Sequence, residues 1–126
     1  MSSAVLDASA VLAYVYDEPG APIVAVSLRD AVVSAVNAAE VVTKLMERDS
    51  PGRAREDFRR LRLEIAPFDL QQAYLVADLR APTRAFGLSL GDRACLALAR
   101  TLRLPALTAD GRWSEVDVGV EVRLIR

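Results

Sequence analysis

The sequence predicts an α/β domain with a mostly parallel central sheet of about five short strands, flanked by helices on both faces. Short apolar or β-branched runs alternate along the chain with longer segments whose apolar residues recur at helical spacing. The links between these segments are short, which implies crossover connections between parallel strands. We expect a single domain over residues 1–126, because 126 residues with an apolar share of 52% suit one core.

The first half of the chain is expected to contain two strands and four helices. In order, these are a strand at 4–6, helices at 8–16 and 22–29, a strand at 31–34, and helices at 37–48 and 53–62. The breaker Glu18–Gly20 ends the first helix, and Pro22 favours the start of the second. Apolar residues share one face of the helix from Asn37, and Ser50–Gly52 ends that pattern. The next helix carries five arginines, whose charges usually face solvent and less often RNA.

The second half is expected to contain three strands and two helices. The strands are predicted at 63–68, 105–108 and 119–125, the last from its alternating pattern. Asp69 is a predicted cap for a long helix that weakens near Pro82, and Gly87 marks the following turn. The segment 89–103 is strongly helical.

Composition restricts the chemistry that is available to this chain. Histidine is absent, so any catalysis must use carboxylates, hydroxyls, arginine or a metal. Sixteen basic and seventeen acidic residues nearly balance, so nucleic-acid binding would need a local patch. The single cysteine, Cys95, excludes an internal disulfide. With no signal-like start and no apolar run of roughly 18 residues, we expect a cytoplasmic protein without a membrane span.

Four acidic residues follow or flank the predicted strand ends. Asp7 comes directly after one strand and Asp110 two residues after another, while Glu40 and Asp92 lie near the starts of two helices. In open α/β sheets, ligands bind at the carboxyl ends of the strands, where loops from distant parts of the chain meet. We therefore expect all four carboxylates to converge at one edge of the sheet.

Each acid also has a purely structural alternative. Asp7 and Asp110 could be helix N-caps, because carboxylates accept the free N–H groups there. The segment Ser89–Asp92 matches a capping box, and Asn37–Glu40 is a near relative of one. Glu40 could also pair with Lys44 one helical turn later. The joint placement of the four acids, more than any single one, favours a common site.

A cluster of carboxylates is tolerated when a cation occupies its centre. Oxygen ligands without histidine or cysteine favour Mg²⁺ or Mn²⁺ over zinc, and such ions assist phosphodiester hydrolysis. Ser9 and Thr108 could hydrogen-bond a carboxylate or a metal-bound water, or could cap backbone groups. Arg93 and Arg112 adjoin the acids and could meet a phosphate, or could form ordinary surface ion pairs.

Four short motifs resemble those of the PIN-domain nucleases, in particular the VapC-like toxins of bacterial and archaeal type II toxin–antitoxin pairs. They are Val5–Ala10, Ser34–Val41, Leu88–Ala94 and Leu107–Asp110, each carrying one of the four acids in the family's order and spacing. The resemblance implies a PIN-like domain over nearly the whole chain and an Mg²⁺- or Mn²⁺-dependent endoribonuclease that arrests growth by cutting cellular RNA. It also implies a homodimer whose acidic pocket is blocked by a cognate antitoxin.

Other functions fit the sequence less well or share its fold. A haloacid-dehalogenase-type phosphatase would need a second aspartate where Ser9 stands, and a receiver module would need a lysine near the last strand, whereas the only lysine is Lys44. A stand-alone PIN nuclease and a PIN scaffold that binds RNA or protein without cleavage both remain alternatives.

Overall fold

The central sheet has five strands, all parallel. A computed structural model describes residues 1–126 and shows the strands in the order β3-β2-β1-β4-β5. Their bounds are β1 Ala4–Leu6, β2 Ala31–Ser34, β3 Glu64–Ala66, β4 Ala106–Thr108 and β5 Val122–Leu124. Val5 on the central strand lies opposite Val32 on one side and Ala106 on the other. The predicted fold class, an α/β domain with a parallel sheet, is confirmed.

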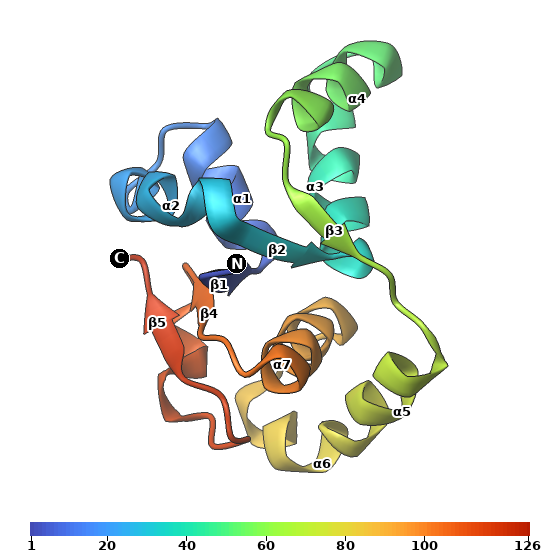
Figure 1. Ribbon diagram of the computed structural model, residues 1–126, viewed down its shortest axis with the longest axis vertical. Coiled ribbons are helices and arrows are strands. Elements are labelled where there is room, and N and C mark those ends of the chain that lie inside the picture. The colour runs from blue at the N-terminus through green and yellow to red at the C-terminus, as the bar shows by residue number, and fades with distance from the viewer.

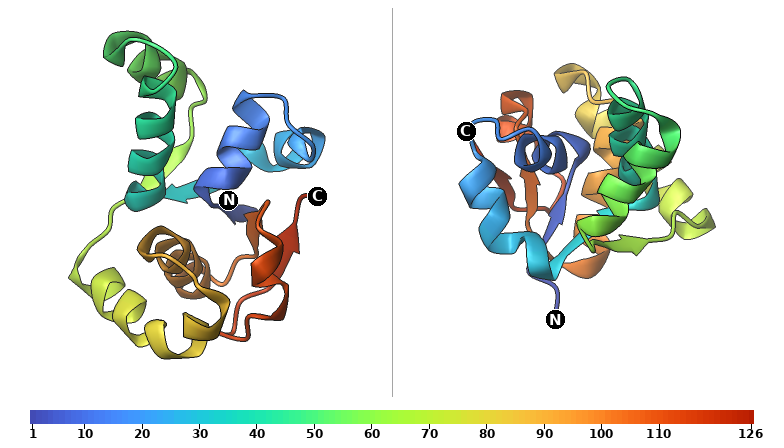
Figure 2. Two further views of the ribbon diagram at one scale, coloured as in Figure 1. Left: turned by 180° about the vertical axis from the view of Figure 1, so that it is seen from behind. Right: turned by 90° about the horizontal axis from the view of Figure 1, so that it is seen from above.

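Helices cover both faces of this sheet (Figures 1 and 2). Their bounds are α1 Ala8–Val15, α2 Ala21–Ser27, α3 Ala35–Met46, α4 Pro51–Arg60, α5 Leu70–Asp78, α6 Arg80–Thr83 and α7 Leu90–Leu102. Helices α1 to α4 lie on one side of the sheet, and α5 to α7 lie on the other (Figure 1). Each β-α-β connection therefore returns to the sheet as a crossover, as parallel strands require.

The pleat of the central strand divides the core into two clusters. Val5 points into the cluster beneath α7, while its neighbours Ala4 and Leu6 point into the cluster beneath α1 to α4. All three side chains are at most 1% exposed, since β1 has a strand on each side and helices on both faces. The residue that follows the central strand is thus attached to a fully buried segment that is paired on both sides.

Two helices begin earlier than the apolar pattern predicts, because serines cap them. Ser34 ends β2 and its hydroxyl accepts a hydrogen bond from the Val36 N–H, so α3 begins at residue 35 and not at Asn37. Ser50 caps α4 in the same way through the Arg53 N–H, with Pro51 as the first helical residue. The segment 50–52, which is predicted to end one helix, therefore also begins the next.

The second half departs from the predicted bounds mainly at the sheet edges. β3 and β5 each keep only three residues of the longer predicted strands, because only these residues pair with a neighbour. The helix capped by Asp69 ends at Asp78, and α6 with the short 3-10 helix Arg84–Phe86 completes the connection. A further 3-10 helix at Gly111–Glu115, absent from the sequence prediction, buries Trp113 completely.

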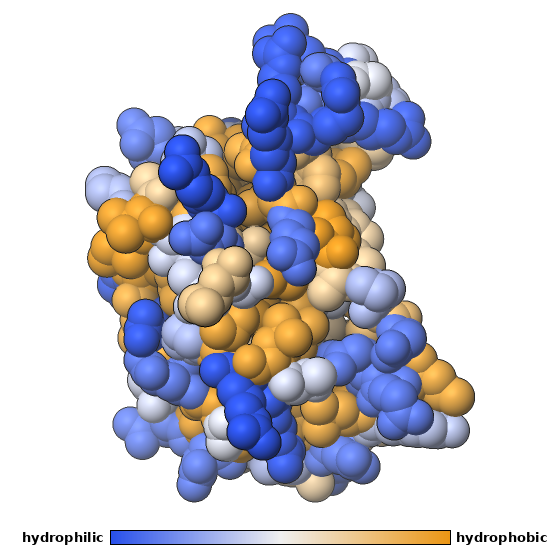
Figure 3. Space-filling view, in the orientation of Figure 1, coloured by the Kyte–Doolittle hydropathy of each residue, from blue (hydrophilic) through white to orange (hydrophobic).

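Helices α3 and α4 form an arm that projects from the body of the molecule (Figure 1). Hydrophilic side chains gather on the end of this arm (Figure 3). Three arginines of α4 form ion pairs within the helix: Arg53 with Asp57, and Arg59 and Arg60 with Glu56. None of the helices is both long and apolar enough to span a bilayer.

Candidate metal centre

The topology places the ends of β1 and β4 at a switch point of the sheet. From β1 the chain crosses to β2 and β3 on one side, and only later returns to β4 and β5 on the other. Asp7 follows β1 and Asp110 follows β4, so the two residues leave adjacent strands at the same edge. In open α/β sheets the crevice at such a point is where ligands bind.

Asp7 is buried and held on every side by hydrogen bonds. It is 4% exposed; its Oδ1 accepts from the Ser9 hydroxyl at 2.7 Å and from the Ala10 N–H at 2.8 Å. Its Oδ2 accepts from the Thr108 hydroxyl of β4 at 2.6 Å. Burial raises the pKa of Asp7 to about 6, against the lowering effect of these hydrogen bonds and with a further increase from the charge of Asp92. The hydrogen bonds therefore fix the Asp7 carboxylate in one orientation, and the burial of its charge lowers the stability of the folded protein.

Asp92 belongs to the first turn of α7 and Asp110 to the loop after β4, and Arg112 lies between them. The Arg112 Nη2 is 2.6 Å from Asp110 Oδ2 and 3.8 Å from Asp92 Oδ2. Its Nη1 donates to the Gly87 carbonyl at 3.2 Å, which holds the guanidinium across the edge of the site. Hydrogen bonds from Arg112 hold the pKa of Asp110 below its ordinary value.

Glu40 reaches the site from α3 by lying against the first turn of α7. The Asn37 amide donates to Glu40 Oε1 at 2.8 Å and to the Gly91 carbonyl at 2.9 Å. Gly91 leaves room for the carboxylate, because a Cβ atom there would stand 2.3 Å from Glu40 Oε1. Glu40 is otherwise exposed, so its position depends on these two neighbours.

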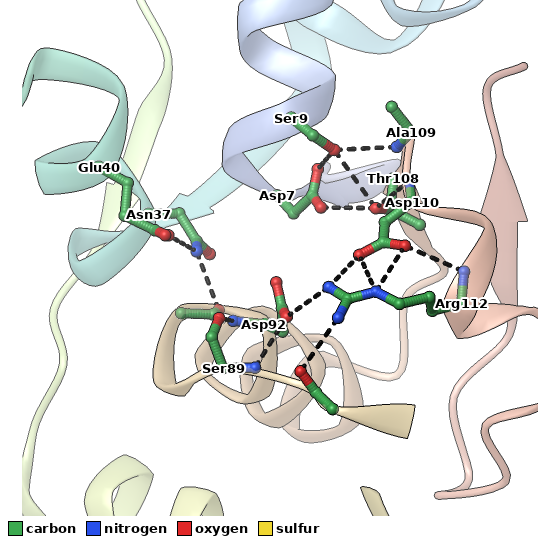
Figure 4. A network of polar contacts seen from close by, with 12 residues as sticks. Asp7, Ser9, Asn37, Glu40, Ser89, Asp92, Thr108, Ala109, Asp110 and Arg112 are labelled. Atoms are coloured by element: carbon green, nitrogen blue, oxygen red, sulfur yellow. Dashed lines mark hydrogen bonds and ion pairs between the residues drawn. The ribbon is translucent and has the colours of Figure 1, made fainter. Parts of the chain in front are cut away.

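The four acids surround a common space at the sheet edge (Figure 4). Cys95 of α7 is affected by the charge of three of the acids: burial raises the pKa of its thiol, and Asp7, Asp92 and Glu40 raise it further. No three of the carboxylates are close enough together to hold one ion in this arrangement. The carboxylates stand apart from one another because like charges repel, and because Arg112 holds Asp110 in a separate ion pair.

Three of the acids also serve as helix caps, which was the structural alternative. Asp7 caps α1, Asp92 and Ser89 form the predicted capping box, and Asp110 accepts from the Arg112 N–H at 3.0 Å. Capping uses only part of each carboxylate: no hydrogen bond within the protein reaches Asp92 Oδ1. The two roles are therefore compatible.

The structural alternative for Glu40 is wrong. Lys44 pairs with Glu47 at 3.5 Å, and no salt bridge joins it to Glu40. Asn37 is not at a cap position either, because it is buried within α3 and faces α7.

The two arginines beside the acids have different surroundings. Arg112 faces Asp110 and Asp92, where a phosphate could reach it. Arg93 turns toward α5, and its Nη1 donates to the Val76 carbonyl at 3.0 Å. This hydrogen bond joins α7 to α5 and has no part in the acidic site.

Two residues of the site were not predicted from the sequence: Asn37, whose amide contacts Glu40, and Gly91. A polar residue on the apolar face of α3 and a glycine inside a helix are the signals that could have found them.

The oxygen-only donor set suits Mg²⁺ or Mn²⁺. Glu40 Oε2 and Asp92 Oδ1 carry no hydrogen bond from the protein, and Asp7 is held by the Thr108 hydroxyl of β4. Asp92 and Asp110 have side chains that are 19% and 25% exposed, so an ion and its water ligands can approach from solvent. Closing the site on an ion would require side-chain rotations and the release of Asp110 from Arg112.

Fold and site together define an α/β domain with a carboxylate cluster at its switch point. The sequence matches the PIN domain family over residues 4–119, and the chain belongs to this family. Among curated proteins, none is a significant match to the sequence.

Solved structures of toxin–antitoxin proteins share this fold. DNA-bound VapBC from Salmonella typhimurium is similar with a TM-score of 0.78, at 16% identity over 100% of both chains. VapC20 from Mycobacterium tuberculosis, described as a sarcin-ricin loop cleaving toxin, has a TM-score of 0.71 at 15% identity over 94% of this chain and 99% of that chain. FitAcB from Neisseria gonorrhoeae has a TM-score of 0.70 at 22% identity over 95% and 96% of the two chains. At these identities the likeness establishes the fold alone.

Proposed function

We propose that this chain is a metal-dependent endoribonuclease and the toxin of a toxin–antitoxin pair. The observation that carries the proposal is the gathering of four carboxylates from four separate segments at the switch point of a PIN domain. A fold gains nothing in stability from such clustering, whereas a divalent cation and a phosphate ligand would account for it. The similarity to VapBC and VapC20 supports a nuclease with a toxin's role.

Asp7, Glu40, Asp92 and Asp110 are the proposed ligands. When bound at these oxygens, Mg²⁺ or Mn²⁺ supplies the Lewis acidity that phosphodiester hydrolysis needs, so histidine is not required. Asp7 is the fixed member, because Ser9 and Thr108 hold both of its oxygens.

The remaining residues would bind and orient the RNA strand. Arg112 is 55% exposed and lies at the rim of the acids, so its guanidinium can exchange the Asp110 carboxylate for a phosphate of similar geometry. Arg93 is not among the proposed RNA contacts, because its guanidinium already donates to the Val76 carbonyl. The preference for RNA rests on the family resemblance.

A cognate antitoxin is the proposed protein partner. A groove of about 510 Å³ lies between α1 and α3 and has Glu40 in its lining. Its apolar residues include Leu12 and Val36, and the ion pair of Lys44 with Glu47 also lines it. An antitoxin segment with apolar side chains in this groove would pass directly beside Glu40 and could block the acids. A toxin–antitoxin complex from Klebsiella pneumoniae shares this fold, which supports a partner of this kind.

Cleavage of RNA by the purified protein tests the enzymatic proposal. We expect cleavage with Mg²⁺ or Mn²⁺, none with EDTA, and a loss of at least about 100-fold in Glu40→Gln, as is typical when one catalytic charge is removed. Glu47→Gln at the end of the same helix is the matched control and should cleave normally. Metal binding without cleavage of any RNA would favour the scaffold alternative. Mapping the cleavage sites in total RNA would then identify the target.

The partner proposal has a separate test. A short gene next to this one, encoding a small DNA-binding protein, should yield a product that co-purifies with the chain and suppresses cleavage. Leu12→Glu should weaken this complex, whereas Val26→Glu, an 85% exposed apolar position on α2, should leave it intact. Absence of such a partner would favour a stand-alone nuclease. The homodimer implied by the resemblance and the cytoplasmic location expected from the composition stay predictions, and the mass in solution tests the first.

A further inference from the structure

Helices α3 and α7 are in contact where the Glu40 side chain lies against Gly91. A Cβ atom at Gly91 would stand 2.3 Å from Glu40 Oε1, 2.6 Å from its Cδ and 2.7 Å from Oε2. The backbone of Gly91 is ordinary helix, where glycine is less favourable than alanine, so its conformation does not explain the residue. The glycine is explained instead by the space that the Glu40 carboxylate occupies, which a side chain at position 91 would fill.

Asn37 completes this contact from the opposite side. Its side chain is 1% exposed and donates through one nitrogen to both Glu40 Oε1 and the Gly91 carbonyl. The opposite amide orientation would place Oδ1 against two acceptors, so the contacts determine the orientation. The Asn37 Oδ1 is buried without a hydrogen-bond partner in the protein, which disfavours an amide at this position on stability grounds. A reason other than stability is needed for an asparagine here.

We propose that Asn37 and Gly91 are positioning residues that set the Glu40 carboxylate beside the α7 turn carrying Asp92. Gly91 provides the space, and the Asn37 amide fixes the rotamer of an otherwise exposed side chain (Figure 4). Glu40 and Asp92, which are 52 residues apart in the sequence, would then both be available as ligands of a divalent cation. This inference rests on the proposed function and assigns it two further residues.

The test compares glycine-to-alanine substitutions at two equivalent helix positions. Gly91 and Gly52 are each the second residue of their helix, and a Cβ at Gly52 would meet nothing within 4 Å. Mn²⁺ affinity is measured by calorimetry or by electron paramagnetic resonance of free Mn²⁺. We expect Gly91→Ala to weaken Mn²⁺ binding by about 10- to 100-fold, as loss of a ligand's supporting contact does, and Gly52→Ala to change it less than about twofold.

Asn37→Leu separates positioning from structure. Leucine has nearly the shape of asparagine and removes the unpartnered buried oxygen, so urea unfolding of the metal-free protein should change little. Mn²⁺ affinity should nevertheless fall by about 10- to 100-fold. A large loss of stability with unchanged affinity would show a purely structural role and overturn the proposal for this residue.

A double-mutant cycle identifies the contact through which Gly91 acts. In metal-free protein, Gly91→Ala should raise the urea midpoint more in a Glu40→Ala background than when Glu40 is present, because alanine favours the helix in both but meets the carboxylate only in the second. An equal effect in both backgrounds would mean that alanine acts on α7 alone, which overturns the proposal. If the unsubstituted protein binds Mn²⁺ and Gly91→Ala does not weaken it, only this inference fails. If the unsubstituted protein binds no Mn²⁺, the proposed function fails with it.

Discussion

Replacing Asp7 with asparagine is expected to stabilise the metal-free protein at neutral pH. The carboxylate is 4% exposed, and burial disfavours its charged form more than its hydrogen bonds favour it. Asparagine keeps the shape and can keep the contacts: its oxygen accepts from Ser9 and the Ala10 N–H, and its amide donates to Thr108. The substitution therefore removes a buried charge without leaving a cavity.

The magnitude follows from the pKa of Asp7, which rises from 3.8 to about 6 on folding. Because the folded state holds its proton more tightly than the unfolded state, ionisation costs stability as the pH rises from 3.8 to about 6, and the loss is complete above that range. A difference of about 2 pH units corresponds to about 3 kcal/mol. Asp7→Asn should therefore gain about 3 kcal/mol at pH 8, but only about 1 kcal/mol at pH 4.5.

Urea unfolding in EDTA at these two pH values measures the effect. At pH 8 the midpoint should rise by about 1 to 3 M, given the usual dependence of unfolding free energy on urea for small domains. Asp69→Asn is the matched control, because Asp69 also caps a helix but is exposed, and its substitution should change stability by less than about 0.5 kcal/mol. Lower stability of Asp7→Asn at both pH values would refute the reasoning, since capping would then outweigh the buried charge.

Divalent metal should reverse the order of the two proteins. Mn²⁺ stabilises whichever folded protein binds it, in proportion to the logarithm of its concentration above the dissociation constant. The unsubstituted protein should gain stability with added Mn²⁺, whereas Asp7→Asn should not. An equal gain in both would exclude Asp7 from the metal site.

Three further outcomes are expected. Thr108→Val should lower stability at pH 8 by about 1.5 to 3 kcal/mol, because a 2.6 Å hydrogen bond to a charged carboxylate is lost, with a smaller loss at pH 4.5. Arg112→Gln should tighten Mn²⁺ binding by about two- to fivefold, measured by calorimetry, because the exposed ion pair with Asp110 no longer competes; weaker binding would contradict this. Cys95 should resist a thiol reagent in the native protein and react once urea unfolds it, and fast native labelling would show that α7 is not packed.

Local patterns in the sequence predict most of the secondary structure and the fold class. Strand and helix periodicities are properties of neighbouring residues, so the alternation of β1, α1, β2 and α3 can be recognised without tertiary information. Most errors lie at the element ends. Ser34 and Ser50 extend α3 and α4 beyond the apolar pattern, because a cap adds residues that have no apolar face to recognise.

The sequence by itself also placed Asp7 and Asp110 after strands, and Glu40 and Asp92 near helix starts. It could not decide that β1 and β4 are neighbours, because strand order depends on pairing between segments about 100 residues apart. That pairing brings Thr108 onto Asp7 and makes the edge a switch point.

Tertiary structure alone decided the surroundings of the four acids. Arg93 and Arg112 look equivalent beside their acids, yet one turns to α5 and the other crosses the site. Asn37 and Gly91 gain their importance only where α3 meets α7, since close approach of two helices is invisible in either helix alone. Residue types at strand and helix ends thus determined what chemistry the chain can offer, and packing between distant segments decided which of those groups meet.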